Sequence, residues 1–336
     1  MAEVAVIGAG LMGHALALVF ALGGHRVRLT DNNPETLQRA PGLMATALET
    51  LAEAGEVDAA HDRPWLSTAV RCVPSLADTV KGASVVVEAV AERPDVKRTL
   101  YDQLQSLMEP DAILASNTSN LDIFPLVPDA LQDRTIIAHW YTPPYLCDLV
   151  DLCPGPATKP GAIETVRDMV KAMGKAPVVF KQMVQGYVAN RLQAAMQLEV
   201  YRLLDEGLVT PKDIDDSVLH GLALRIPILG IMAKADFTGL LLMQQGLKNR
   251  SYTPPEPADN SPTLDALIAA GRTGVMAGKG YFDWGDRTPE ALFRERDRKL
   301  LALKQALRAI GPMEPTTRAI GPTEPTTRAI GPTESA

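Results

Sequence analysis

Short apolar segments alternate with longer helix-like segments through the first half of the chain. Such alternation predicts an α/β domain with a Rossmann, doubly wound and mostly parallel sheet. A second, wholly helical domain is expected to follow it. Strands are expected at 4–7, 26–30, 69–73, 84–90, 112–115 and 135–138, edge strands at 149–152 and 177–180, and helices at 11–22, from 31 to about 54 and at 94–107, with a loop through residue 65.

The pattern becomes helical from about Gly186. Apolar residues at helical spacing predict a helix over 190–204, which Gly207 ends, and Pro211 opens the next helix. The sequence ends in a ten-residue repeat, Arg-Ala-Ile-Gly-Pro and its continuation, which is too poor in apolar residues to fold alone. We therefore expect a Rossmann domain over 1–182, an all-helical domain over 183–306 and a disordered tail over 307–336.

Three glycines follow the first strand with G-x-G-x-x-G spacing, at Gly8, Gly10 and Gly13. In a strand-to-helix turn they allow a tight bend, a close approach of the backbone to a pyrophosphate, and close packing of helix on strand. The pyrophosphate then binds the free amide groups at the start of the helix. A turn of the same kind without a ligand is the alternative, since glycines also mark ordinary turns.

Asp31, at the end of the second strand, indicates which dinucleotide binds. A carboxylate in this place accepts a hydrogen bond from the ribose 2′-hydroxyl and repels a 2′-phosphate. Asn32 and Asn33 add no positive charge to offset that repulsion. The predicted cofactor is therefore NAD and not NADP.

Composition narrows the class of protein. A chain of 336 residues that is 46% hydrophobic can fill a large core over two domains. Its net charge of −7 argues against nucleic acid and an anionic membrane surface as partners. Three cysteines without metal-ligand spacing predict no metal site and fit a reducing, cytoplasmic location. We expect neither a secretory signal nor a membrane-spanning segment.

Four polar residues are expected around one crevice at the ends of strands or the start of a helix: Ser119, His139, Asp151 and Asn190. Hydride transfer from an alcohol to a nicotinamide needs a base for the hydroxyl proton, and histidine suits neutral pH. It also needs a group that orients the imidazole and donors that hold the reacting oxygen. Each residue also has a purely structural explanation, as a satisfied strand histidine, a helix cap or a turn residue.

Over about residues 3–305 the chain resembles the L-3-hydroxyacyl-CoA dehydrogenase family. The matching motifs, in chain order, are Gly8-Ala9-Gly10-Leu11-Met12-Gly13 with Asp31, Glu88-Ala89-Val90-Ala91-Glu92 with Lys97, Ser116-Asn117-Thr118-Ser119, His139 with Pro143 and Leu149-Val150-Asp151, Gly186-Tyr187-Val188-Ala189-Asn190-Arg191-Leu192, and Gly278-Lys279-Gly280-Tyr281-Phe282. The resemblance implies that His139 is the general base or acid, that Ser119 holds the reacting oxygen and that Asn190 contacts the substrate carbonyl. With the glycine turn, it implies an NAD site formed by Gly8, Gly10, Leu11, Met12, Gly13, Asp31, Asn32, Ala91, Glu92, Lys97, Asn117 and Ser119.

Two departures from the family pattern bear on the substrate. Asp151 stands where the family has a glutamate that orients the histidine, so the backbone must approach or a water intervene. The segment 31–80, which in the acyl-CoA enzymes carries lysines that bind coenzyme A, has no lysine here and places Glu49 and Glu53 on its helix. Repulsion of a phosphate-rich ligand then favours the branch that acts on free hydroxy acids, which includes the lambda-crystallin/gulonate and carnitine dehydrogenases.

Like several enzymes of that branch, the chain has an arginine in a glycine-rich turn of the helical domain, Arg225. Its planar guanidinium could clamp a substrate carboxylate, and the alternative is a structural ion pair with Asp215 or Asp216. The leading prediction is an NAD-dependent dehydrogenase of a small 3-hydroxy acid or ring hydroxymethyl carboxylate.

Two other functions stay open at this point: a 3-hydroxyacyl-CoA dehydrogenase of fatty-acid β-oxidation, and a nucleotide-binding protein without catalysis. Apolar helical segments at 226–232 and 240–243 predict a homodimer through the helical domain. The alternative is that these segments form the core of their own domain.

Overall fold

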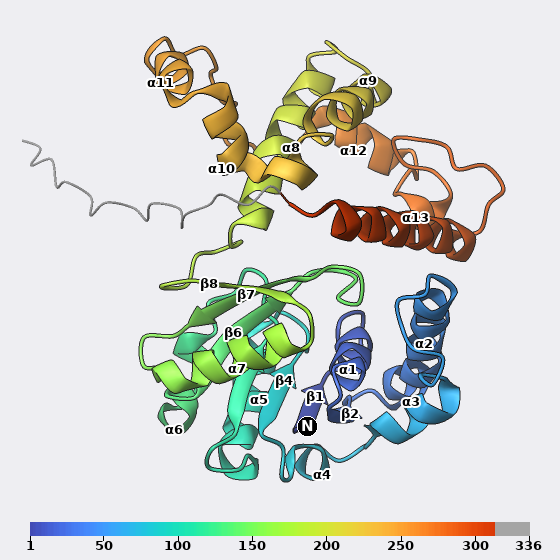
Figure 1. Ribbon diagram of the computed structural model, residues 1–336, viewed down its shortest axis with the longest axis vertical. Coiled ribbons are helices and arrows are strands. Elements are labelled where there is room, and N and C mark those ends of the chain that lie inside the picture. Colours follow the sequence, from blue (N-terminus) through green and yellow to red (C-terminus); the bar gives the residue numbers. More distant parts are fainter. Residues whose placement is uncertain (313–336) are drawn as a thin grey trace, which may run out of the picture. The chain divides into compact units, whose positions relative to one another are not determined.

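The computed structural model describes residues 1–312, which fall into two compact units (Figure 1). The first unit comprises residues 1–198 and 266–302, and the second comprises 199–265 and the described residues from 303 onward. The domain boundaries expected from the sequence stay predictions. Most of the tail expected over 307–336 lies outside the described residues.

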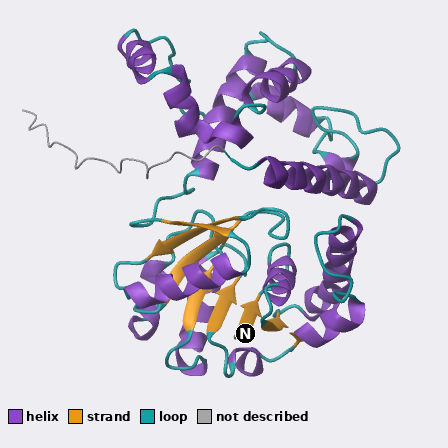
Figure 2. Cartoon of the chain, in the orientation of Figure 1, coloured by secondary structure: helices purple, strands orange, loops and turns teal. Residues whose placement is uncertain are grey.

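An eight-stranded sheet occupies the centre of the first unit (Figure 2). The strand order is β3-β2-β1-β4-β5-β6-β7-β8, and every neighbouring pair is parallel except β6 and β7. The predicted Rossmann-like, mostly parallel sheet is confirmed. The strands are β1 Glu3–Ile7, β2 Arg26–Thr30, β3 Val70–Cys72, β4 Val85–Glu88, β5 Ile113–Ser116, β6 Thr135–Trp140, β7 Leu149–Pro154 and β8 Ala176–Val179.

Helices cover both faces of this sheet because its central strands are apolar on both sides. In β1, Val4 and Val6 belong to one core cluster and Ala5 and Ile7 to the other, as the two-residue period of a strand requires. The first cluster includes residues of α1, α2 and α7, and the second includes residues of α4 and α5. The helices of this part are α1 Gly13–Leu22, α2 Pro34–Glu53, α3 Arg63–Ala69, α4 Leu76–Val80, α5 Pro94–Leu107, α6 Asp129–Gln132 and α7 Pro160–Ala172.

Three local predictions were wrong. The loop expected through Trp65 is the short helix α3, which begins because the Asp62 side chain accepts a hydrogen bond from the Trp65 amide at 2.8 Å. The expected edge strand at 149–152 is β7, which is interior because β8 pairs with its outer side. His139 and Asp151 lie within β6 and β7 and not beyond their ends.

The elements that follow β8 in the described residues are all helical, which confirms the predicted C-terminal helical domain. Its elements are α8 Ala189–Asp205, α9 Pro211–Ser217, a π-helical turn at Val218–Leu222, α10 Ile226–Thr238, α11 Leu240–Lys248, α12 Pro262–Ala269 and α13 Pro289–Ile310. The Thr210 side chain and Asp213 cap α9 reciprocally, which explains why this helix begins at Pro211. The last helix, α13, extends four residues into the segment predicted as tail.

No single helix among residues 1–312 is long and apolar enough to cross a membrane. The segments Pro211–Leu222 and Ile226–Thr238 meet the length and composition requirement only when taken together, and they are bent by 71° at their junction. A cytoplasmic location stays a prediction.

Candidate active site

The glycine turn after β1 has the shape that a dinucleotide needs. A Cβ on Gly8, whose φ is 96°, would lie 2.5 Å from the Ala89 carbonyl oxygen, and a Cβ on Gly13 would lie 1.6 Å from the Gly8 carbonyl oxygen. Glycine is therefore required at both positions. A Cβ on Gly10 would meet no protein atom within 4 Å, so open space lies where a pyrophosphate would approach the backbone.

We expect Gly10→Ala to weaken NADH binding by about tenfold to a hundredfold. The added methyl group would fill the space of the cofactor, and overpacking of this kind costs about 1–3 kcal/mol. Fluorescence titration with NADH measures the affinity. Gly161→Ala in α7 is a matched control, because a Cβ there also meets nothing within 4 Å and lies outside the turn. Equal NADH affinities for the two variants would contradict the assignment of the turn.

A cavity of about 320 Å³ opens beside the glycine turn. Most of the residues predicted to hold the cofactor line this cavity, whereas Gly8, Gly13, Asp31 and Asn32 do not. The lining residues are Gly10, Leu11, Met12, Ala89, Val90, Ala91, Glu92, Lys97, Asn117, Thr118 and Ser119.

Asp31 is fixed at the end of β2. Its Oδ2 accepts a hydrogen bond from the Ala9 amide at 2.7 Å, and its Oδ1 accepts one from the Asn33 amide at 2.8 Å. Because each carboxylate oxygen has further acceptor capacity, the side chain can still receive ribose hydroxyl groups. Asn32 is exposed next to it. The residues present therefore fit NAD.

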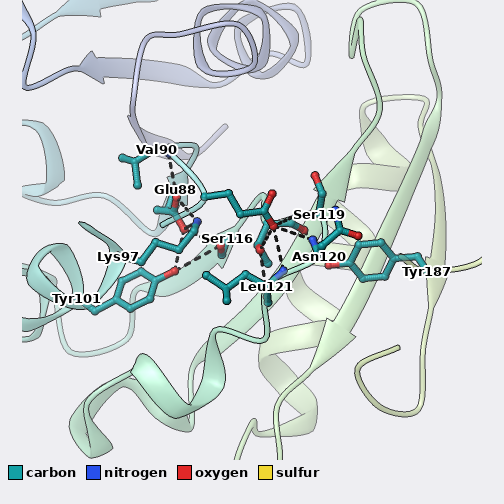
Figure 3. A network of polar contacts seen from close by, with 11 residues as sticks. Glu88, Val90, Lys97, Tyr101, Ser116, Ser119, Asn120, Leu121 and Tyr187 are labelled. Atoms are coloured by element: carbon teal, nitrogen blue, oxygen red, sulfur yellow. Dashed lines mark hydrogen bonds and ion pairs between the residues drawn. The ribbon is translucent and has the colours of Figure 1, made fainter. Parts of the chain in front are cut away.

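Glu88, at the end of β4, is the centre of a buried polar network (Figure 3). Its carboxylate accepts hydrogen bonds from Lys97 Nζ at 2.7 and 2.6 Å, the Tyr101 hydroxyl at 2.8 Å, the Ser116 hydroxyl at 2.6 Å and the Val90 amide at 2.9 Å. Burial and the negative charge of Glu88 raise the pKa of Tyr101 well above its usual value, which keeps its hydroxyl a donor. Lys97 thus lines the cavity while Glu88 holds its ammonium group.

A second carboxylate, Glu92, fixes the loop that carries Ser119. Its Oε1 accepts hydrogen bonds from the Thr118 hydroxyl at 2.8 Å and from the amides of Ser119, Asn120 and Leu121 at 2.9, 2.7 and 2.9 Å. Burial alone would raise the pKa of Glu92, but these four hydrogen bonds outweigh it and lower the pKa. At neutral pH an ionised Glu92 therefore orients the loop at the end of β5.

His139 lies directly opposite Asp151 in the antiparallel pairing of β6 and β7. Their side chains are 5% and 2% exposed, and His139 Nδ1 is 3.6 Å from Asp151 Oδ2. That distance is longer than a hydrogen bond, as expected from an aspartate that is shorter than the family glutamate. Asp151 Oδ2 instead accepts a hydrogen bond from the Tyr141 hydroxyl at 2.7 Å. The structure thus brings the predicted base and carboxylate together without joining them directly.

Tyr187 connects the imidazole to the Ser119 loop. Its ring stacks on His139 with centroids 4.6 Å apart and an interplanar angle of 22°, and its hydroxyl donates to the Thr118 carbonyl oxygen at 2.8 Å. Tyr187 is fully buried and has a φ of 50°, which is uncommon for a residue with a side chain. Gly186, with a φ of 76°, begins this turn just before α8.

Asn190 lies in the first turn of α8, close to the same loop. A Cβ built on Gly186 would be 4.0 Å from Asn190 Cβ and 3.8 Å from Asn120 Oδ1, so both asparagines lie near this glycine. Asn117 reaches β6 from the loop, because its Oδ1 accepts a hydrogen bond from the Trp140 amide at 2.8 Å. The first unit thus gathers Ser119, His139, Asp151 and Asn190 through a few connecting contacts.

Arg225 belongs to the second unit, and its part in the site stays a prediction. The side chain is exposed, and its Nε donates to the Gly221 carbonyl oxygen at 3.1 Å. Within residues 1–312 no ion pair joins Arg225 to Asp215 or Asp216, and Asp216 pairs with Lys212. The structural alternative considered for this arginine is therefore not found in the described part of the chain.

Sequence reasoning missed the roles of Glu88, Tyr141 and Tyr187. A signal for Glu88 was present, since a carboxylate that ends a wholly apolar strand needs a buried partner. The two tyrosines gave no such signal, because their contacts depend on strand register and on an unusual turn.

Comparison with known proteins identifies the family. Residues 3–183 match the 3-hydroxyacyl-CoA dehydrogenase NAD binding domain, and residues 186–284 match the C-terminal domain of the same family. Among relatives, 5-formyl-3-hydroxy-2-methylpyridine 4-carboxylate 5-dehydrogenase of Mesorhizobium japonicum is 31% identical over 306 residues, 91% of this chain and 98% of that protein. Lambda-crystallin of Oryctolagus cuniculus is 32% identical over 229 residues, 68% of this chain and 72% of that protein.

Solved structures agree with the sequence comparison. A structure of the 5-formyl-3-hydroxy-2-methylpyridine 4-carboxylic acid 5-dehydrogenase, described as an NAD+-dependent dismutase, superposes with a TM-score of 0.82 at 30% identity over 93% of this chain and 100% of that chain. The (S)-3-hydroxybutyryl-CoA dehydrogenase of Ralstonia eutropha gives a TM-score of 0.67 at 27% identity over 85% of this chain and 100% of that chain. The protein therefore belongs to the 3-hydroxyacyl-CoA dehydrogenase family and is an NAD-dependent oxidoreductase.

Proposed function

We propose that the enzyme oxidises the hydroxyl group of a small 3-hydroxy acid or related hydroxy carboxylate, with NAD as the hydride acceptor and His139 as general base. The observation that supports a free acid best is the comparison with the pyridine-carboxylate dehydrogenase, which extends over nearly the whole of both chains with a TM-score of 0.82. The superposition on the hydroxybutyryl-CoA dehydrogenase, which acts on a thioester, has the lower TM-score of 0.67.

The site residues divide the reaction between them. NAD, when bound, supplies the carbon that receives the hydride. Because Nδ1 of His139 faces Asp151, its Nε2 is the nitrogen left to take the hydroxyl proton. The carboxylate of Asp151 stabilises the imidazolium that results. Ser119 holds the reacting oxygen, and Asn190 contacts the carbonyl group of the substrate.

Glu49 and Glu53 exclude coenzyme A less strongly than the sequence suggests. Arg63 donates to Glu49 at 2.8 and 2.6 Å, and Arg298 of α13 donates to Glu53 at 3.3 and 2.8 Å. Each carboxylate thus has a guanidinium partner, which reduces its repulsion of a phosphate. The absence of lysine from 31–80 still separates this helix from a lysine-bearing coenzyme A site.

The second candidate function is a 3-hydroxyacyl-CoA dehydrogenase of fatty-acid β-oxidation. It is favoured by the family assignment and by the solved hydroxybutyryl-CoA dehydrogenase. A nucleotide-binding protein without catalysis is the third, and the contacts of His139 with Asp151 and, through Tyr187, with the loop that carries Ser119 speak against it.

A substrate panel tests the proposal. We expect NADH formation from small 3-hydroxy acids or hydroxymethyl ring carboxylates, and little from 3-hydroxybutyryl-CoA at the same concentration.

Arg225→Ala should raise KM for the acid about tenfold or more, because a lost charge-assisted hydrogen bond costs about 1.5–3 kcal/mol. Arg225→Lys keeps the charge without the planar guanidinium, so its KM should lie between those of the unaltered enzyme and Arg225→Ala. Preference for the thioester, or an unchanged KM in Arg225→Ala, would contradict the corresponding part of the proposal.

We also propose a homodimer through the helical domain. In the second unit, Phe237, Leu241 and Leu247 are 68%, 79% and 81% exposed, on α10 and α11. Side chains of this size, exposed together, indicate a surface that a partner covers. Sedimentation equilibrium measures the mass in solution, and a monomer at micromolar concentration would contradict the proposal.

A further inference from the structure

The nitrogen of His139 that faces Asp151 has no hydrogen-bond partner within the described residues. Nδ1 is buried and lies 3.6 Å from Asp151 Oδ2, too far for a hydrogen bond. Buried polar atoms are nearly always paired, so an unpaired one at a reaction site calls for a physical explanation.

The explanation lies in Tyr141. Tyr141 directly follows β6, and its ring contacts the His139 ring edge to face with centroids 4.6 Å apart. Asp151 is directly opposite His139 in the strand pairing. The Tyr141 hydroxyl donates to Asp151 Oδ2 at 2.7 Å, and this is the same oxygen that lies 3.6 Å from His139 Nδ1. The hydrogen bond from Tyr141 therefore fixes this oxygen at a position 3.6 Å from Nδ1, although the oxygen could also accept a second donor.

We propose that Tyr141 is a positioning residue that sets the basicity of His139 by holding the Asp151 carboxylate short of a direct hydrogen bond. The proposal rests on the function proposed above, in which His139 is the base. The Asp151 carboxylate lies 3.6 Å from the imidazole and already accepts a hydrogen bond from Tyr141. It therefore favours the imidazolium less than a carboxylate that forms a direct, charge-assisted hydrogen bond with the imidazole.

The other titratable groups around His139 are neutral or held by other partners. On β7, burial, Asp122 and Asp151 raise the pKa of Cys153 to about 12. Burial also raises the pKa of Tyr187, stacked on the imidazole, and that of Tyr141, which is raised further by its bond to Asp151. Glu92 acts on Tyr187 but is bonded to the Ser119 loop. Among the described residues, Asp151 is therefore the carboxyl group that forms a close contact with the imidazole.

We expect Tyr141→Phe to raise the titration midpoint of the His139 imidazole by about one pH unit, a tenfold increase in its proton affinity. Without the hydroxyl, Asp151 is free to turn toward Nδ1 and accept a direct hydrogen bond. NMR titration of the imidazole signals in the enzyme without substrate measures the midpoint, and His139→Gln identifies the signal. The pH profile of kcat should move in the same direction.

Two further variants separate this role from a general structural effect. Tyr145→Phe removes another tyrosine hydroxyl, 3.4 Å from Asp297, and should leave the midpoint unchanged. In an Asp151→Asn background, Tyr141→Phe should produce no shift, because its effect is exerted through the carboxylate. An unchanged midpoint in Tyr141→Phe, an equal shift in Tyr145→Phe, or a persisting shift in the Asp151→Asn background would each overturn the proposal.

The titration also separates the two proposals. It needs neither substrate nor turnover, so a midpoint shift in Tyr141→Phe supports the positioning role even if His139→Gln stays active. In that case the function of His139 as base fails and the electrostatic coupling stands. If His139→Gln loses activity and Tyr141→Phe shows no midpoint shift, the function of His139 as base is supported and the positioning role of Tyr141 fails.

Discussion

Replacement of His139 by glutamine is expected to lower kcat by about 10²- to 10⁴-fold, the usual contribution of a positioned acid–base group. Glutamine has a similar reach and can hydrogen bond, but it cannot take up the hydroxyl proton at neutral pH. Affinity for NADH should remain within about twofold, because His139 is not among the residues that line the cavity at the glycine turn. Steady-state rates of NADH formation and NADH fluorescence titration measure the two quantities.

His25→Gln is the matched control for this experiment. The His25 ring accepts a hydrogen bond from the Ala2 amide at 3.2 Å and contacts Phe20, and His25 does not line the cavity at the glycine turn. Its kcat should equal that of the unaltered enzyme. If the kcat of His139→Gln is within tenfold of that of His25→Gln, His139 is not the general base.

The second large effect is expected from Lys97→Met, which should lower the free energy of unfolding by about 3–5 kcal/mol. Lys97 and Glu88 form an ion pair with side chains 2% and 0% exposed, so loss of the ammonium leaves a buried carboxylate without its counter-charge. Urea unfolding measures the change. Because Glu88 also holds Tyr101 and Ser116, the variant should in addition loosen the wall of the cavity.

Two companions make the Lys97 experiment decisive. Arg63→Met breaks the exposed pair with Glu49, whose side chains are 67% and 49% exposed, and should cost less than about 1 kcal/mol. Glu88→Gln combined with Lys97→Met removes both charges while keeping an acceptor for the hydroxyl groups, and should recover part of the loss. If Lys97→Met is no more destabilising than Arg63→Met, the buried ion pair contributes no more to stability than the exposed one, which contradicts the prediction.

Local patterns in the sequence were enough for the glycine turn and for most strands and helices. The glycines at 8, 10 and 13 act within a few residues of one another, and the apolar strands were read from single segments. The helix at 63–69 was overlooked although its capping residue, Asp62, and its early proline were visible.

The details of the catalytic site depend on contacts between distant segments. Lys97 on α5 meets Glu88 on β4, and Tyr187 before α8 meets His139 on β6. Strand identity alone does not give these contacts, because a register one residue different would place every side chain on the other face. The partner of Asp151 is likewise a residue that no motif singles out.

The reversal of direction between β6 and β7 has a consequence for how the proton-transfer pair assembles. Groups on parallel strands meet only after a long crossover has folded, whereas these two are separated by one short connection and meet when a single ladder closes. The distance between imidazole and carboxylate is therefore built into the pairing of two neighbouring strands. Evolution can lengthen or reshape the rest of the intervening loop for new substrates and leave that distance intact, provided the pairing of Trp140 with Val150 and the hydrogen bond from Tyr141 to Asp151 are kept.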